Sequence, residues 1–533
     1  MSLFGSKNKH DDEPANGHHR PDDDEGSSQQ HQAPQRPPDE LTRLLPNRLD
    51  SDRPFLTPDD PAVSPYNLWT VRVVRYATVL FTVATFVWWI LQLVAIFVTP
   101  PGMHTRASGF FSFSYASLAL FTTLFTLVFF SAPSRAVRVL SVYMGVMLLV
   151  NMIIMLAVSR NRHEEGWVGI TSVIWALLMS LWAVLADRTV KWGKAEEEER
   201  LTGRVETRRT VLEWTAVTLS TISYVVLSVV ISLLTLTLIL RSLDQSVAPP
   251  GERYWVDGDQ YQIHVFCSGN ATDVTGKKQP TVLFEGGEMP VEYGLWQFAD
   301  AAVANGSISR YCFVDRPGFA WSDTAPSPLS AGMAIDATSE ALARADESGP
   351  WIVAAAGIGS IYARIFSSRH GRDIHGLLLI DPLHEDLLGR VASPGRGFLL
   401  WFRGIISPLG LERLPGAIFR GRTGEDRLWG RSSRQSGKTI FTRLQEGLVA
   451  DTLTRRDVTS ARAIQDQDTP LTVITSGLEM KRDSQWEKKQ RDLTRLTRNL
   501  LHWDVVEKTP HEVWTTYEGR QRIEKRLAQL VRG

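Results

Sequence analysis

The chain has 533 residues with 58 basic and 58 acidic side chains, so its overall charge gives no indication of a nucleic-acid partner. A chain of this length has room for two or three domains. Apolar and polar residues are segregated along it, with long Leu, Val, Ile and Phe runs in one third and Asp, Pro, His and Gln in another. This segregation favours an integral membrane protein over a water-soluble one.

Residues 1–65 contain the runs DDEP, PDDDEGSSQQ and QRPPDE and almost no aromatic residues. Such a segment buries too little apolar surface to offset its chain entropy, so we predict a disordered tail. It lacks the charged-then-apolar start of a signal peptide, and its acidic runs argue against a mitochondrial presequence. The first hydrophobic helix is therefore expected to act as the targeting signal.

A short sorting signal is predicted in this tail. Glu40, Leu44 and Leu45 form the pattern Glu-x-x-x-Leu-Leu. The pattern resembles the acidic dileucine motif that cytosolic sorting adaptors recognise in extended segments. Chance occurrence is the alternative, because short motifs are common.

A membrane domain is predicted over residues 66–245. A helix needs about 20 apolar residues to cross a hydrocarbon core of roughly 30 Å. Five stretches meet this requirement, at 76–98, 110–130, 137–158, 167–185 and 211–240. Glu213 is the only acid in them and lies at the start of the last, where it reaches the interface. The spans lack the scattered ionisable residues of a transport pathway, so a transporter with an accessory domain is the least favoured hypothesis.

The distribution of Lys and Arg predicts the orientation of these spans. One side of the membrane carries Arg72, Arg75, Arg135, Arg138, Arg188, Lys191, Lys194, Arg200, Arg204, Arg208 and Arg209. The other carries Arg106, Arg160, Arg162 and Arg241. The imbalance predicts a cytosolic N-terminus, and five crossings then place the C-terminal domain in the lumen or outside the cell. An endomembrane, vacuolar or plasma-membrane location is favoured over a mitochondrial one.

Two further features agree with this orientation. The N-x-Ser/Thr sites of the chain, at Asn270 and Asn305, both follow the last span, where glycosylation requires a lumenal location. The two cysteines, Cys267 and Cys312, lie there too. An even count permits one disulfide in such a compartment, although two buried free thiols remain the alternative.

From residue 252 onward, short β-rich runs alternate with helical stretches, which predicts a mostly parallel sheet covered by helices on both faces. The runs are YQIHVFC, TVLFEGG, RYCFVDRPG, WIVAAAGIGS, GLLLIDP and PLTVITSG. With Asp315-Arg-Pro-Gly, Ile361-Tyr-Ala-Arg, Leu379-Ile-Asp-Pro and His511 in this order, residues 252–533 resemble the α/β-hydrolase superfamily. Fused to a multi-span membrane domain, the chain resembles fungal-type integral membrane hydrolase-like proteins.

The resemblance exposes a departure at the nucleophile. In this superfamily a serine sits on a tight strand-to-helix turn of the form small-x-Ser-x-small. Aligning residues 359–364 with the family pattern places Gly357 at the serine position and Ala356 where a histidine is usual. Glycine offers no nucleophile. Ser360 is the obvious substitute, but it lies three residues into the helix, where a small residue for close packing is the alternative.

The oxyanion position is altered as well. The resemblance places the stabilising backbone N–H groups in the loop containing Gly287 and Glu288 and at Ile358, after the nucleophile position. Glu288 stands about where an apolar residue is usual. An inward carboxylate would repel an oxyanion and an outward one would have no effect, and the sequence leaves both open.

The resemblance implies His511 as the catalytic histidine, after the last strand and before the final helix. Its acid partner is Asp381 or, after the next strand, Glu479 or Asp483, because either strand supplies the acid in this superfamily. A structural His–acid pair without catalysis is the alternative.

Two more elements follow from the resemblance. Residues 387–460 interrupt the fold where hydrolases insert a cap, and a helix on the membrane surface is the alternative reading of this segment. The second strand of the superfamily's sheet runs antiparallel beside the fourth, which would bring Cys267 near Cys312.

The leading functional hypothesis is a membrane-anchored, catalytically degenerate α/β-hydrolase domain that binds a ligand or a protein partner. The alternative is an active serine hydrolase of esters or lipids that uses Ser360 or another serine with His511. We expect the lipid bilayer as a partner, with a lipid, an ester or a protein as further candidates. Nothing in the sequence indicates a metal or a cofactor.

Overall fold

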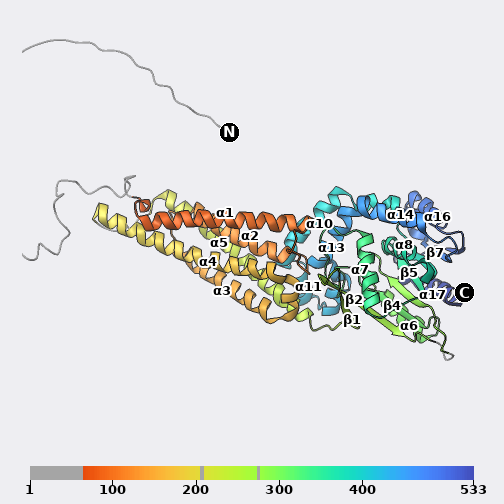
Figure 1. The fold of residues 1–533 in the computed structure, drawn as a ribbon. Helices are drawn as coiled ribbons and strands as arrows, with labels where there is room; N and C mark the ends of the chain where they lie inside the picture. Colours follow the sequence, from red (N-terminus) through yellow and green to blue (C-terminus); the bar gives the residue numbers. More distant parts are fainter. Residues whose placement is uncertain (1–63, 204–208, 273–275, 533) are drawn as a thin grey trace, which may run out of the picture. The chain divides into compact units, whose positions relative to one another are not determined.

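The computed structural model describes residues 64–203, 209–272 and 276–532. Figure 1 shows a helical part formed by the first half of this range and an α/β part formed by the second half. The predicted sorting motif at Glu40, Leu44 and Leu45 lies outside the described residues.

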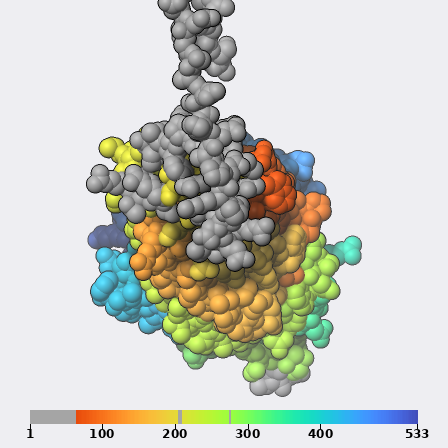
Figure 2. Space-filling model, turned by 90° about the vertical axis from the view of Figure 1, so that its left-hand side faces the viewer, coloured from red at the N-terminus to blue at the C-terminus, as the bar shows by residue number. Residues whose placement is uncertain are grey.

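Five helices long and apolar enough to cross a membrane follow one another in the helical part. They are α1 (Trp69–Phe97), α2 (Phe110–Val128), α3 (Arg135–Ala157), α4 (Ser159–Thr202) and α5 (Val211–Asp244). The most hydrophobic window of α1 is only 17% buried, against 33–56% for the others, and Figure 2 shows α1 at the edge of the helices. In α4, Gly166 leaves the helical conformation just before Trp167. The prediction of about five spans is confirmed.

Polar side chains join these helices to one another. Asn151 of α3 accepts a hydrogen bond from the Tyr115 hydroxyl of α2 at 3.1 Å and donates to Thr235 of α5 at 2.6 Å. Trp175 and Trp182 of α4 donate through their indole N–H groups to threonines of α1. Such bonds fix how the helices pack, because lipid provides no alternative partner for the polar groups.

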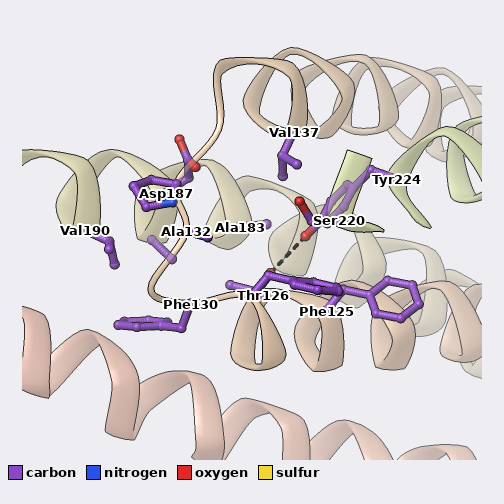
Figure 3. A pocket seen from close by; sticks show the side chains of 13 residues that line it. Phe125, Thr126, Phe130, Ala132, Val137, Ala183, Asp187, Val190, Ser220 and Tyr224 are labelled. Carbon is purple, nitrogen blue, oxygen red and sulfur yellow. Dashed lines mark hydrogen bonds between the residues drawn. The ribbon is translucent and has the colours of Figure 1, made fainter. Parts of the chain in front are cut away.

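A small cavity lies between α2, α3, α4 and α5, with Asp187 at its rim (Figure 3). Its volume is about 30 Å³, which is room for a water molecule or two. Thr126 and Tyr224 share a hydroxyl hydrogen bond of 2.9 Å beside it, and Asp187 pairs with Arg138 at 2.6 Å. We interpret this cavity as a packing feature of the helices.

The α/β part contains an eight-stranded sheet in the order β1-β2-β4-β3-β5-β6-β7-β8. The strands are β1 (Glu252–Val256), β2 (Tyr261–Gly269), β3 (Thr281–Glu285), β4 (Arg310–Val314), β5 (Trp351–Ala356), β6 (Ile374–Ile380), β7 (Leu471–Ser476) and β8 (Leu500–Val506). β2 is antiparallel to both neighbours, and every pair from β4 onward in this order is parallel. This is the strand order of the α/β-hydrolase fold, so the predicted fold class is confirmed.

Helices cover both faces of the sheet, as the apolar strands require. The helices of this part are α6 (Leu295–Ala304), α7 (Ala331–Arg344), α8 (Gly359–Arg369), α9 (Leu388–Val391), α10 (Pro394–Ile406), α11 (Arg413–Phe419), α12 (Gly424–Leu428), α13 (Gly437–Val449), α14 (Arg455–Ile464), α15 (Gly477–Arg482), α16 (Ser484–Leu493) and α17 (Tyr517–Arg532). One core forms between the sheet and α7, α8 and α14, and the other between the sheet and α6 and α17. Helices α9 to α14 all lie in the insertion between β6 and β7.

A disulfide joins Cys267 of β2 to Cys312 of β4. The two residues are directly opposite in the antiparallel pair, which is the arrangement that the resemblance implies. The bond closes a loop with a sequence separation of 45 residues, and loop-closure entropy then stabilises the folded state by roughly 3 to 4 kcal/mol. The expected bridge is confirmed.

The insertion packs directly on the ends of the membrane helices. Gly404 of α10 lies against the Phe110 ring at the start of α2, where an added Cβ would meet a ring carbon at 2.1 Å. Gln445 of α13 donates to the Ile96 carbonyl of α1 at 2.8 Å. Two backbone hydrogen-bonding groups of Ser327 also bond to Thr99, between α1 and α2. The insertion therefore contacts the membrane helices as well as the sheet.

Candidate functional site

The turn between β5 and α8 has the backbone shape of a nucleophile position. Gly357 has a φ of +48°, in the left-handed region that the tight turn requires. Gly359, at the start of α8, lies so close to the loop after β3 that an added Cβ would be 2.2 Å from the Gly286 carbonyl. Ile358 precedes α8 and is buried. The chain therefore has the backbone turn of a nucleophile position, but a glycine stands where the serine would be.

His511 lies at this turn and is paired with Asp381, which follows β6. Its Nδ1 atom is 2.6 Å from Oδ2 of Asp381. Asp381 is fully buried, and its Oδ1 atom accepts from the Ser476 backbone N–H at 3.1 Å and from the Trp486 indole at 3.0 Å. These bonds fix the carboxylate, so the histidine is held as in a hydrolase triad.

Glu288 points inward and occupies the space of the missing nucleophile. Its Oε2 atom is 3.1 Å from Nε2 of His511. A Cβ added to Gly357 would lie 2.7 Å from the same carboxylate oxygen and 2.8 Å from Nε2 of His511. The nitrogen that would face a serine in a triad therefore faces a carboxylate, and His511 is bracketed by two acids.

The charges at this position reinforce each other. Burial disfavours the imidazolium form, but hydrogen bonds to Asp381 and Glu288 and their negative charges raise the pKa of His511 to about 11. Burial also disfavours the Glu288 carboxylate, but the hydrogen bond and charge of His511, with smaller effects from its own backbone N–H and Arg316, lower the pKa of Glu288 to about 2. The Glu288 side chain remains 43% exposed, so water screens part of this attraction. At neutral pH His511 holds its proton.

Ser360 lies behind the turn. It is fully buried, and its hydroxyl donates to the Gly357 carbonyl at 2.7 Å and to the Leu383 carbonyl at 3.2 Å. Within the described residues, its hydrogen bonds go to these backbone groups and not to His511. This is the packing role that the sequence left as the alternative.

Glu479 and Asp483, the other candidate acids, both lie at the starts of helices. Glu479 is the third residue of α15, and its backbone N–H donates to Ser476, the residue that caps this helix. Asp483 caps α16 by accepting from the Gln485 backbone N–H and pairs with Arg390 at 2.5 Å. The pattern Ser476-x-x-Glu479 is a helix-start signature that already indicates this role in the sequence.

Arg316, in the marker Asp-Arg-Pro-Gly, holds the loop after β3 in place. It is buried, and its guanidinium donates to the Gly286 carbonyl and, at 2.6 Å, to the Gly287 carbonyl. It also lies 3.4 Å from Glu446 of α13. Arg443 of the same helix donates to the Glu288 carbonyl. The insertion therefore covers the loop that carries Gly287 and Glu288, as a hydrolase cap would.

A relative of the chain spans both its parts. An uncharacterized protein of Schizosaccharomyces pombe is 30% identical over 527 residues, which cover 93% of this chain and 97% of the relative. The chain belongs to the family of this fission-yeast protein. Residues 40–267 also match the model of a region of unknown function, DUF2417.

An uncharacterized vacuolar membrane protein of Saccharomyces cerevisiae is 27% identical to this chain over 386 residues, which cover 61% of this chain and 59% of the relative.

Among solved structures, a probable hydrolytic enzyme of Pseudomonas aeruginosa is 14% identical to this chain, with a TM-score of 0.40. The match covers 53% of this chain and 95% of that structure. An enol-lactonase of Burkholderia xenovorans is 14% identical, with a TM-score of 0.33, and covers 53% of this chain and 100% of its own.

A buried acidic cluster beside β2 is the clearest metal-like arrangement in the described residues. His264, Glu292 and Asp315 bring ligand atoms within 4.8 Å of one another. Nδ1 of His264 is 2.9 Å from Asp315, and burial together with Asp315 raises the pKa of Glu292 well above its usual range. Both carboxylate oxygens of Glu292 and the Nε2 atom of His264 are buried without a hydrogen-bond partner in the described residues. A second group, Cys267, Cys312 and Glu347, has both its sulfur atoms in the disulfide.

The two predicted glycosylation sites, Asn270 and Asn305, are both exposed. Asn270 follows β2 and Asn305 follows α6. The side chain of Asn305 donates to Glu524 at 2.5 Å. Both side chains are therefore at the surface, as a glycan would require.

Proposed function

We propose that this protein is a membrane-anchored α/β-hydrolase-fold protein whose hydrolase site is catalytically degenerate and serves to bind a ligand or a protein partner. The observation that carries the proposal is the contact between Glu288 and His511. It places a carboxylate in the space that a serine side chain needs, beside a glycine that offers no nucleophile.

The chemistry of this contact supports the proposal in two ways. A general base must accept a proton at Nε2, but the His511 imidazole is already protonated and both its nitrogens face acids. An oxyanion hole must stabilise a developing negative charge, but the Glu288 carboxylate lies at the loop that would supply one of its donors. The hydroxyl of Ser360, which bonds to backbone carbonyls, offers no replacement.

A fluorophosphonate probe tests the proposal, because it labels activated serines without knowledge of the substrate. We expect the full-length protein in membranes to be labelled no more than its His511→Ala variant. Ser360→Ala and Ser368→Ala, two serines of the same helix, serve as matched variants and should also change nothing. Strong labelling that disappears in Ser360→Ala but persists in Ser368→Ala would overturn the proposal in favour of a serine hydrolase.

We further propose a vacuolar membrane location with the C-terminal domain in the lumen. The name of the budding-yeast relative supports the organelle, and the Lys and Arg distribution supports the orientation. The disulfide supports an oxidising compartment for the domain. The dileucine motif at Glu40, Leu44 and Leu45 remains a prediction that would explain sorting to that organelle.

Glycosidase treatment and protease protection test this orientation. We expect endoglycosidase to increase the gel mobility of the protein, and the change should be lost when Asn270→Gln and Asn305→Gln are combined. A tag at residue 20 should be digested when protease is added to intact vacuoles, while the C-terminal domain stays protected. An unglycosylated domain that the protease digests would reverse the assignment.

A further inference from the structure

A cavity of about 290 Å³ lies where the membrane helices meet the α/β part. Its walls come from the start of α4, the end of α5, β1, the loop after β4, and α11, α12 and α13. It is about ten times larger than the cavity of Figure 3. Water occupies roughly 30 Å³ per molecule in the liquid, so this cavity has room for a ligand of several atoms.

Positive charge dominates its lining. Six cationic side chains line it, namely Arg160, Arg241, Arg253, Arg413, Arg427 and Lys438. The acids that line it are Glu164 and Asp244. The lining residues therefore carry four more positive than negative charges.

Four acids neutralise four of these cations. Glu164 pairs with Arg160 at 2.6 Å and also with Arg241, and Asp244 pairs with Arg413 at 2.8 Å and with Arg427 at 2.5 Å. Two acids outside the lining add to them, because Glu165 pairs with Arg241 at 2.5 Å and Asp323 lies 3.4 Å from Arg160. The excess positive charge of the cavity therefore belongs to the remaining two cations.

Arg253 and Lys438 are left without an acid partner. In the described residues, neither makes an ion pair, and the Nη1 atom of Arg253 is buried with no hydrogen-bond partner. The Lys438 ammonium donates to the Ala320 carbonyl at 2.9 Å. Burial and the charge of Arg160 outweigh nearby acids and lower the pKa of Lys438 to about 8. Holding these two cations in the cavity is costly without an anion.

The first turn of α13 adds to the positive field. Gly437, Lys438 and Thr439 begin this 13-residue helix and line the same cavity. A helix N-terminus presents backbone N–H groups and a partial positive charge, which favour an anion. Planar guanidinium groups with a lysine are the side chains that bind phosphate oxygens best.

We propose that this cavity binds an oxyanion of the phosphate type, supplied either by the headgroup of an anionic lipid or by a soluble phosphate. Arg253, Lys438 and the first turn of α13 are its main contacts. The proposal does not depend on whether the His511 site is inactive.

The surroundings of the cavity suit a lipid. A neighbouring cavity of about 170 Å³ shares Arg413 with it and is lined by Phe402, Ile406 and Leu411. The helices α10 and α11 beside it leave Phe398, Leu399, Ile418 and Phe419 exposed, with fractions between 55% and 82%. Because α10 packs against Phe110 of α2 and α11 contacts α5, these two helices lie beside the membrane helices, where their exposed apolar side chains can contact acyl chains.

Binding to the full-length protein in nanodiscs tests the proposal. One arm adds inorganic phosphate to protein in phosphatidylcholine discs and measures the shift in melting temperature. The other replaces part of the phosphatidylcholine with phosphatidic acid and measures lipid retention by native mass spectrometry. A saturable shift with phosphate indicates a soluble anion, and selective retention of phosphatidic acid without that shift indicates a lipid headgroup.

Charge-removing variants locate the site. Combining Arg253→Gln with Lys438→Gln should weaken binding at least tenfold, while the exposed pair Arg456→Gln and Lys481→Gln should leave it unchanged. Without ligand, the cavity variant should melt at the same or a higher temperature, because it loses unpaired cations, and this shows that it folds. The proposal is wrong if wild-type protein binds neither probe saturably, or if both double variants bind equally well.

Discussion

Combining Gly357→Ser with Glu288→Ala is expected to produce fluorophosphonate labelling that the unmodified protein lacks. The serine supplies a hydroxyl at the turn, and removing the carboxylate clears the space 2.7 Å from its Cβ. His511, still held by Asp381 at 2.6 Å, then faces the serine through Nε2. The three groups would have the arrangement of a triad, in which the histidine takes the serine proton.

Related variants separate the two expected causes of inactivity, the missing serine and the carboxylate of Glu288. Gly357→Ser alone should give weak labelling at most, because Glu288 keeps the histidine protonated and crowds the new side chain. Gly357→Ser with Glu288→Gln retains the bulk of the glutamate without its charge, so it tests whether space or charge limits activity. Adding His511→Ala to the active combination should abolish labelling. Labelling of Gly357→Ser alone at the level of the combination would show that Glu288 is no obstacle.

The serine at position 357 is expected to lower the folding stability of these variants only slightly. A residue other than glycine at a φ of +48° costs roughly 1 to 2 kcal/mol, because its Cβ approaches the following carbonyl. Hydrolases place their nucleophile on the same kind of strained turn, so the fold tolerates this cost. Melting temperatures of the variants would separate loss of folding from loss of activity.

Long-range pattern in the sequence was enough to predict the architecture. Uncharged runs of about 20 residues specify membrane helices almost without regard to the rest of the protein. Short β-rich runs that alternate with helical stretches specify a parallel sheet, and both of these predictions depend on periodicity, which a single sequence contains. The strand order that places Cys267 opposite Cys312 came from the resemblance to the α/β-hydrolase superfamily, and the structure has the same order.

The site could be predicted only in part, because side-chain direction depends on packing. The sequence placed Glu288 in the oxyanion loop but left the direction of its side chain open. That direction depends on the contact with His511, which forms only in the folded chain. The choice of Asp381 over Glu479 was open too, although the helix-start pattern at Ser476 favours it in retrospect. The cationic cavity was not foreseen, because Arg160, Arg253 and Lys438 are far apart in the sequence and line one cavity only in the folded chain.

The pairing of His511 with Glu288 also sets a pH dependence. The pKa of His511 is raised in the folded state, from 6.5 to about 11, so its stabilisation is complete below pH 6.5 and is lost as the pH rises through about 11. The pKa of Glu288 is lowered, from 4.5 to about 2, so its stabilisation is complete above pH 4.5 and is lost as the pH falls through about 2. Both contributions are complete between about pH 4.5 and 6.5.

Diethyl pyrocarbonate footprinting measures the protonation of His511 directly, because the reagent modifies only the neutral imidazole. At pH 7 we expect almost no modification of His511, whereas His502, whose pKa is lowered by burial and by Arg526, should react readily as an internal control. Glu288→Gln should raise the modification of His511 about tenfold or more, because each unit of pKa that is lost increases the neutral fraction tenfold. His511 retains 28% exposure of its side chain, so the reagent has access in both proteins. Equal and rapid modification of His511 and His502 in the unmodified protein would show that the histidine is neutral, and that Glu288 does not hold it in an inactive form.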